Sequence, residues 1–148
     1  MKFNVFEGGF APVRAHFDDA GIDFRTPESF VLEPAGTPGD SHVVDLKVGV
    51  EIPIGYFGKM ESKSGLMVNH SVCCGGGVID SGFRGSIKVR MINHDPNYAY
   101  SFERGDKIVQ MVVQPVLLCG LEEVKELDPS ESGRDDSGFG STGKERNI

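Results

Sequence analysis

The sequence has 148 residues, of which 39% are hydrophobic and 25% are charged, and its formal net charge is -7. This length and composition predict one folded domain with its own hydrophobic core and exclude an intrinsically disordered chain. The acidic balance argues against general binding to DNA or RNA, which depends on clustered lysine and arginine, so a phosphorylated ligand is expected to be a nucleotide.

Hydrophobicity alternates with a period of two from Val44 to Ile54, which predicts a strand with one buried and one solvated face. Pro53 marks the end of that strand or a sheet edge. A short helix is expected from Ser64 to His70. No long helical pattern occurs elsewhere, so the chain is predicted to be built mainly from strands.

A second alternating stretch covers residues 86–92 and points Ile87, Val89 and Met91 inward. The run from Ile108 to Leu118 is nearly all apolar and rich in valine, which predicts a strand buried on both faces. Glycine, proline, asparagine and aspartate cluster between these segments and mark turns. Many short strands with frequent turns predict an all-β fold, either a sandwich or a distorted jelly-roll or β-barrel-like fold.

The composition changes at residue 128, where glycine, serine and acidic residues become frequent. We expect residues 1–127 to form a β-barrel domain and residues 128–148 to form a flexible C-terminal arm. Residues 138–144 nearly match a phosphate-binding P-loop, but Glu145 stands where serine or threonine would hold magnesium, so a P-loop is rejected. Phe139 still offers a flat face for a base, and its neighbours offer hydroxyls and backbone N–H groups to an anion.

No apolar run approaches the ~20 residues that cross a bilayer, and the first residues are too polar for a signal peptide. We therefore expect no membrane association and a cytoplasmic location, or a nuclear one in a eukaryote. The cysteines Cys73, Cys74 and Cys119 predict no disulfide framework, because their number is odd, and no metal site, because ligand pairs at suitable spacing are missing around them.

Five segments resemble, in order and spacing, the five motifs of the trimeric dUTPase family. They are residues 20–24 (AGIDF), 62–66 (SKSGL), 77–85 (GVIDSGFRG), 105–110 (GDKIVQ) and Arg134 with 138–143 (GFGSTG). The resemblance covers the chain from about Ala20 to Lys144. It implies a homotrimer with shared active sites that hydrolyses dUTP to dUMP and pyrophosphate with Mg²⁺. Such an enzyme removes dUTP and supplies dUMP for thymidylate synthesis.

The resemblance also implies roles for single residues. Asp80 matches the general base, which activates a water for attack on the α-phosphate. Phe83 stands where the family usually has tyrosine, and its ring is expected to pack under the deoxyribose and exclude a 2′-hydroxyl. The glycine-rich hairpin at 74–77 is expected to read uracil through its main chain, together with Gly77, Val78 and Ile79. Asp23 is expected to hold Mg²⁺ through water.

The phosphates are assigned to three further motifs of the same resemblance. Lys63 replaces the usual arginine of the second motif and keeps its charge without the planar fork, and Ser64 and Gly65 follow it. Gln110 matches a side chain that contacts phosphate. The arm is expected to supply a set of residues that close over the substrate, namely Arg134, Phe139, Gly140, Ser141 and Thr142.

Two other interpretations compete with this one. A dCTP deaminase resembles dUTPase in fold and around the third motif, but that family needs a catalytic glutamate ten residues after its aspartate. Arg90 occupies this position, and a cation cannot act as that base. A non-enzymatic β-sandwich that serves as an interaction module would explain the strands and the acidic balance, but it would not explain the matches at Asp80, Gln110, Arg134 and Phe139.

Overall fold

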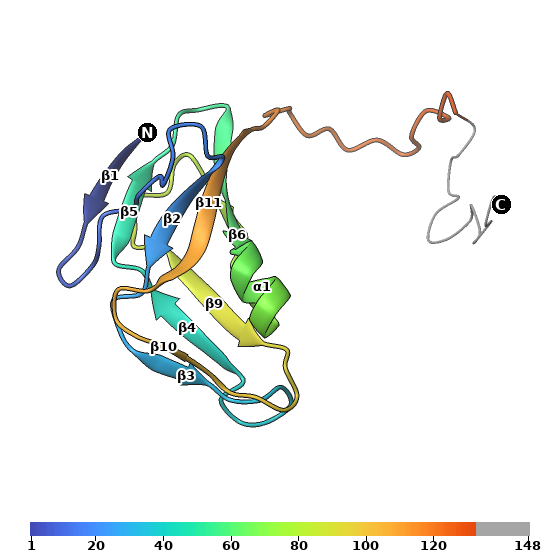
Figure 1. Cartoon of the computed structure of the whole chain (residues 1–148). Coiled ribbons are helices and arrows are strands. Elements are labelled where there is room, and N and C mark those ends of the chain that lie inside the picture. Colours follow the sequence, from blue (N-terminus) through green and yellow to red (C-terminus); the bar gives the residue numbers. More distant parts are fainter. Residues whose placement is uncertain (133–148) are drawn as a thin grey trace. The chain divides into compact units, whose positions relative to one another are not determined.

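The computed structural model describes residues 1–132. The elements of this part of the chain are, in order, β1 (Lys2–Val5), β2 (Gly21–Arg25), β3 (Phe30–Leu32), β4 (Ser41–Asp45), β5 (Val48–Glu51), β6 (Tyr56–Ser62), α1 (Ser64–His70), β7 (Val72–Gly75), β8 (Val78–Ile79), β9 (Lys88–Asn93), β10 (Tyr100–Phe102) and β11 (Lys107–Pro115). The prediction of an all-β fold is therefore confirmed, and the short helix lies where it was expected (Figure 1).

The strands form four small antiparallel sheets. A four-stranded sheet has the order β2-β11-β6-β8, a three-stranded sheet has the order β4-β9-β7, and β1-β5 and β10-β3 are two-stranded. Most neighbours in a sheet are distant in the sequence, which is the pattern of a jelly-roll-like fold rather than of consecutive hairpins. Within the described residues no sheet closes on itself to make a complete barrel.

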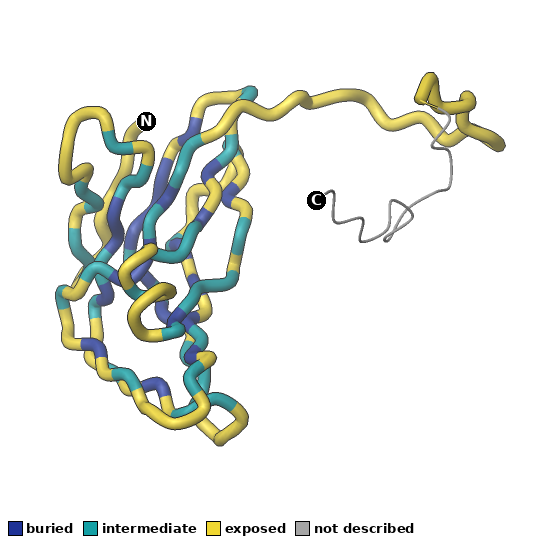
Figure 2. The backbone as a smooth tube through the Cα atoms, turned by 45° about the vertical axis from the view of Figure 1, so that its right-hand side comes forward, coloured by how far each residue is buried: buried dark blue, intermediate teal, exposed yellow. Residues whose placement is uncertain are grey.

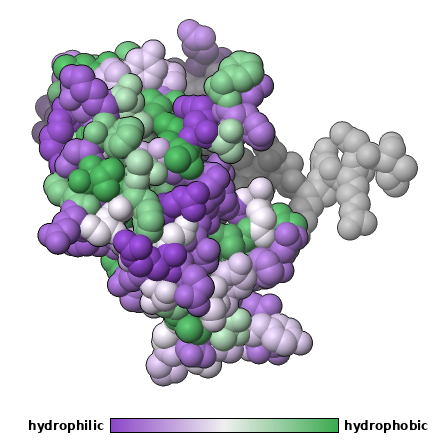
Figure 3. All heavy atoms as spheres, turned by 60° about the vertical axis from the view of Figure 1, so that its left-hand side comes forward, coloured by the Kyte–Doolittle hydropathy of each residue, from purple (hydrophilic) through white to green (hydrophobic). Residues whose placement is uncertain are grey.

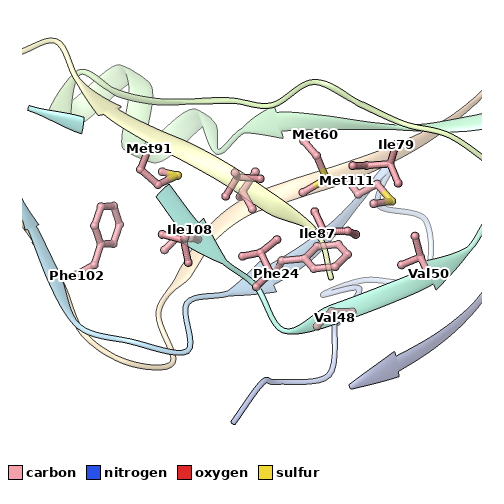
Figure 4. Packing of buried hydrophobic residues seen from close by; sticks show 14 of the residues in the cluster. Phe24, Val48, Val50, Met60, Ile79, Ile87, Met91, Phe102, Ile108 and Met111 are labelled. Carbon is pink, nitrogen blue, oxygen red and sulfur yellow. The ribbon is translucent and has the colours of Figure 1, made fainter. Parts of the chain in front are cut away.

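Inward-facing side chains from all these sheets make one hydrophobic core. Its buried members are Phe24, Leu32, Val44, Leu46, Val48, Val50, Ile52, Met60, Val72, Ile79, Ile87, Val89, Met91, Phe102, Ile108, Val109 and Met111. Figure 4 shows labelled members from β2, β5, β6, β8, β9 and β11 packed side by side. The buried stretches alternate with exposed ones along the tube of Figure 2, because each strand turns only alternate side chains inward.

The predicted strand from Val44 to Ile54 is wrong as a single element, because it breaks into β4 and β5. Lys47 adopts a left-handed conformation with φ of 57°, and its backbone N–H donates to Asp45 Oδ1 at 3.1 Å. β4 pairs with β9, whereas β5 pairs with β1. The predicted buried face nevertheless persists through the break as far as Ile52, while Ile54 is 84% exposed.

The prediction for residues 108–118 is also partly wrong. β11 ends at Pro115 and lies between β2 and β6. Ile108, Val109 and Met111 are buried, but residues 116–118 are exposed. The strand is central, yet only its first half is covered on both faces. The stretch at 86–92 is confirmed, since Ile87, Val89 and Met91 are buried as expected.

The chain divides into two compact units, Met1–Leu118 and Cys119–Ile148. In the second unit, described residues 119–132 are exposed and contain no helix or strand. The three cysteines are all free thiols. Among the described residues, no helix is long and apolar enough to cross a membrane.

Candidate functional site

A cavity of about 600 Å³ opens beside β8 and the start of β9. Its lining residues are Asp45, Val78, Ile79, Asp80, Phe83, Gly85, Ser86, Ile87 and Lys88. Four of the predicted site residues, Val78, Ile79, Asp80 and Phe83, therefore lie together around one space. A volume of several hundred Å³ is the size of a pocket for a small organic ligand.

The loop 80–86 carries the two most distinctive of these residues and connects two sheets. It begins after β8, which pairs with β6 in the four-stranded sheet, and ends before β9, which pairs with β4 in the three-stranded sheet. The Phe83 N–H donates to the Asp80 carbonyl at 3.1 Å. The Arg84 guanidinium folds back onto the carbonyls of Ser81 at 2.6 Å and Phe83 at 2.9 Å. These contacts hold a tight turn that leaves Asp80 exposed.

The Phe83 ring lies over Gly85. A methyl group built on Gly85 would approach the ring to 3.1 Å at Cε2 and to 2.9 Å at Cζ, the latter closer than real side chains come. Phe83 as a residue is 40% exposed, and its side chain both packs on the loop at Gly85 and lines the cavity. An aromatic face held in this way can support a sugar or a base.

Replacing Gly85 by alanine is expected to push the Phe83 ring out of this position. The new methyl group has to displace the ring, so we expect KM for the nucleotide to rise by about tenfold, while the thermal midpoint changes little. Steady-state kinetics of Gly85→Ala measure this effect. Gly82→Ala in the same loop is the matched control, because a methyl group there meets nothing within 4 Å. Equal KM values for both variants would contradict the assigned position of the ring.

The glycine-rich hairpin at 74–77 joins β7 of the three-stranded sheet to β8 of the four-stranded sheet. β7 ends at Gly75, which pairs with Arg90, and the Gly77 carbonyl accepts a hydrogen bond from the Met60 N–H at 2.8 Å. Gly76 has φ of +116°, a conformation that side chains rarely adopt. The segment predicted to read uracil is thus a turn that needs glycine at position 76, and its backbone is held by β6.

A separate cluster of charges surrounds Asp23. Its Oδ1 lies 2.5 Å from Lys63 Nζ and its Oδ2 lies 2.9 Å from Lys107 Nζ, while the Asp23 side chain is only 10% exposed. Burial acts to raise the pKa of Asp23, but hydrogen bonds and charges from the two lysines outweigh it and hold the pKa below its usual value. Asp23 is therefore a carboxylate that orients two ammonium groups at the end of β6 and the start of β11.

Gln110 lies next to this cluster. It pairs with Asp23 across β11 and β2, and its Nε2 donates to the Ser62 carbonyl at 3.1 Å. A methyl group on Gly21 would come within 2.0 Å of Gln110 Oε1, so this glycine makes room for the side chain. Lys63 is the N-cap of α1, and Ser64 and Gly65 form its first turn.

The predicted site residues thus fall into two groups within one chain. The cavity is lined by Val78, Ile79, Asp80 and Phe83 of the third motif but not by Gly77. None of Lys63, Ser64, Gly65 or Gln110 lines it. The arm residues Arg134, Phe139, Gly140, Ser141 and Thr142 lie outside the described residues.

Sequence reasoning missed three polar residues of the cavity, namely Asp45, Ser86 and Lys88. The alternation of the predicted strands turns all three away from the core. It does not indicate that they share a cavity, because Asp45 and Ser86 are 41 positions apart and meet only through the pairing of β4 with β9.

The Asp23 carboxylate has few acceptor positions left for magnesium. An ionised aspartate offers about four acceptor positions, and the lysines at Asp23 occupy two of them. Mg²⁺ on a nucleotide keeps several waters and takes few protein ligands. The surroundings of Asp23 therefore fit a metal that arrives with a triphosphate and is reached through water. Residues 1–132 contain no group of three or more histidines, cysteines or carboxylates that could bind a metal alone.

The topology and the cavity together define a small, all-β, jelly-roll-like protein with a pocket of nucleotide size. A family model described as dUTPase matches residues 10–143, and the chain belongs to the dUTPase family. Over 135 residues it is 40% identical to a deoxyuridine 5′-triphosphate nucleotidohydrolase of Corynebacterium glutamicum, covering 90% of this chain and 87% of that protein. It is 42% identical over 134 residues to the protein of that name from Nocardia farcinica, covering 89% and 78%.

Solved structures agree with this assignment. The dUTPase of Staphylococcus bacteriophage 80alpha with dUpNHpp is 28% identical and superposes with a TM-score of 0.83, covering 96% of this chain and 97% of that chain. A mutant dUTPase from phage phi11 of S. aureus, described with a structural Mg(II) ion, is 27% identical with a TM-score of 0.74, covering 84% and 96%. The family expected from the five motifs is confirmed.

Proposed function

We propose that this protein hydrolyses dUTP to dUMP and pyrophosphate, with Asp80 as the general base. The observation that carries the proposal is the position of Asp80, an exposed carboxylate that lines the cavity next to the Phe83 ring in a chain of the dUTPase family. Asp80 orients a water and takes its proton while the water oxygen attacks the α-phosphorus. The bond from that phosphorus to the bridging oxygen breaks, and pyrophosphate leaves.

The nucleoside is proposed to occupy the cavity. Phe83 packs under the deoxyribose and leaves no room for a 2′-hydroxyl, and the backbone around Gly77, Val78 and Ile79 pairs with the uracil edge. A pocket that must satisfy fixed hydrogen bonds rejects a mismatched base far more strongly than it rejects a missing methylene. The relative from phage 80alpha was solved with dUpNHpp, a uracil nucleotide, which supports this ligand class for the present chain.

The phosphates are proposed to meet the second group of residues. Lys63 and Lys107 place two ammonium groups beside Asp23, and Ser64, Gly65 and Gln110 lie on the adjoining elements. Bound Mg²⁺ neutralises phosphate charge and holds the triphosphate in a reactive shape. Asp23 would accept a hydrogen bond from a water of that metal while it keeps the lysines aimed at the phosphate oxygens.

A homotrimer would bring the two groups together. We propose that one chain supplies the cavity and Asp80, a neighbour supplies Ser64 and Gln110, and a third supplies the arm with Arg134 and Phe139. The compact unit exposes large apolar side chains that a partner could cover, including Phe3, Val5, Ile54 and Tyr56. Figure 3 shows apolar side chains, in green, gathered between hydrophilic ones on one face of the molecule. Exposed apolar clusters of this kind mark interaction surfaces.

The decisive experiment measures the products formed from dUTP, dCTP, dTTP and UTP with Mg²⁺. We expect dUMP and pyrophosphate from dUTP, and slow or no turnover of the other three. Conversion of dCTP into a uracil nucleotide would instead indicate a deaminase. Arg90 argues against that outcome, since it is held by the Ser41 hydroxyl at 3.0 Å and is not among the residues that line the cavity. No turnover of any nucleotide would leave a binding role.

Deleting residues 128–148 is expected to leave a folded trimer with strongly reduced turnover, because the arm would no longer close over the nucleotide. Sedimentation equilibrium tests the assembly, and a full-length mass near 16.0 kDa would contradict a trimer. Phe139→Ala in the full chain is the companion variant and should reproduce part of the loss without changing the mass. Unchanged turnover after the deletion would rule out a catalytic arm.

A further inference from the structure

We infer that Asp45 and Ser86 act as a pair of positioning residues for the loop that carries Asp80 and Phe83. This inference rests on the proposed function. Neither Asp45 nor Ser86 belongs to any of the five motifs. The Ser86 hydroxyl donates to Asp45 Oδ1, and both residues line the same cavity as Asp80.

The loop 80–86 has two ends, and they are held differently. At the first end, Ile79 is fixed by its pairing with Gly58. At the second end, the backbone of Ile87 is held between Leu46 and Val48 by hydrogen bonds of 2.9 Å. The Ser86 side chain adds a bond to Asp45 just before that anchor, so it determines how the last residues of the loop approach the cavity.

Asp45 is itself held in one orientation. Its Oδ1 accepts the Lys47 N–H at 3.1 Å, and its Oδ2 lies 3.1 Å from Lys47 Nζ. Lys47 has a left-handed φ of 57° at the turn between β4 and β5. Burial acts to raise the pKa of Asp45, but the hydrogen bonds from Ser86 and Lys47 outweigh it and lower the pKa. The acceptor of the Ser86 hydroxyl is therefore an ionised and oriented carboxylate, which makes the stronger kind of hydrogen bond.

A movement of Ser86 would be passed on to the Phe83 ring by Gly85. The ring rests on Gly85, the residue before Ser86, so a shift of Ser86 moves the surface under the ring. Gly49 of β5 leaves room for the backbone of this loop, because a methyl group there would come within 3.0 Å of the Arg84 carbonyl and 3.3 Å of the Gly85 carbonyl. A displacement of about 1 Å in such a loop can reduce catalysis by up to roughly a hundredfold.

The test compares Ser86→Ala and Asp45→Ala with the double variant, using dUTP turnover and binding of dUpNHpp. We expect each single change to lower kcat by about tenfold and to weaken dUpNHpp binding. The double variant should be no worse than either single one, because the two residues act as a unit. Ser86→Thr keeps the hydroxyl and should retain most of the wild-type kcat. The assays are run well below the thermal midpoint of each variant, so a loss of kcat reports the position of the loop and not unfolding.

The matched control is Asp40→Asn, an aspartate that accepts one N–H, from Gly36 at 3.1 Å, in an exposed loop. It should leave kcat and KM unchanged. Wild-type kinetics for Ser86→Ala, or additive losses in the double variant, would overturn the inference while leaving dUTP hydrolysis intact. Failure of the wild type to turn over dUTP would instead remove the proposed function itself.

Discussion

Asp80→Asn is expected to reduce kcat for dUTP by about a thousandfold, because an amide cannot take the proton of the attacking water. The change should leave the fold intact, since the Asp80 side chain is exposed and the turn is held by its backbone carbonyl, which asparagine retains. Binding of dUpNHpp should persist, because the ring of Phe83 and the backbone of β8 are untouched. A stopped assay of pyrophosphate release and a calorimetric binding measurement separate these two effects.

Asp40→Asn is again the matched control, since it removes a carboxylate from an exposed loop that does not line the cavity. It should retain full kcat. A general base contributes roughly 10²–10⁴-fold to the rate. If Asp80→Asn kept more than about a tenth of the wild-type kcat, Asp80 would not be that base, and another residue would have to activate the water. Loss of dUpNHpp binding together with kcat would point to a role in holding the sugar.

Asp23→Asn is expected to lower the free energy of unfolding by about 3 kcal/mol, because it leaves two ammonium groups without their shared counter-charge. The side chains of Lys63 and Lys107 are only 27% and 32% exposed, so solvent screens their repulsion incompletely. Urea unfolding at pH 7 measures the effect. We also expect weaker hydrolysis, because the lysines would no longer be held toward the phosphates.

The pH dependence of this effect has a definite sign. The pKa of Asp23 is lowered in the folded chain, so the carboxylate stabilises the fold fully above the unfolded pKa, which is about 3.9. That contribution is lost as the pH falls through the lower folded value. The stability gap between wild type and Asp23→Asn should therefore be constant at neutral pH and shrink below about pH 4. A gap that stays constant down to pH 2.5 would contradict the ion pairs.

Glu61→Gln is the matched control for this prediction. Glu61 pairs with Lys59 at 2.5 Å, but the two side chains are 41% and 47% exposed. An exposed pair of this kind contributes about 0–1 kcal/mol. If Glu61→Gln lowered the free energy of unfolding as much as Asp23→Asn does, burial of the carboxylate would not be what determines the destabilisation.

The sequence predicted part of the lining of the cavity but not how the cavity is assembled. The third motif predicted that Val78, Ile79, Asp80 and Phe83 belong together, and the cavity brings them together. The water-mediated metal role of Asp23 stays a prediction, and its ion pairs with Lys63 and Lys107 were not foreseen. Lys107 lies 84 positions after Asp23, and their contact depends on the pairing of β11 with β2. The sequence of neither strand indicates that the other is its partner.

The sequence by itself determined the family, the all-β class, the helix at 64–70 and the inward faces of 44–52 and 86–92. These features are local, because burial of alternate side chains follows from the period of a strand and because motif order is visible along the chain. Only the tertiary structure decided that the strand predicted from Val44 breaks at Lys47, that Asp45 reaches Ser86 and that the residues predicted to contact phosphate lie apart from the cavity. Strands pair through backbone N–H and C=O groups that are alike at nearly every residue, so the choice of partner is made by the packing of the whole core.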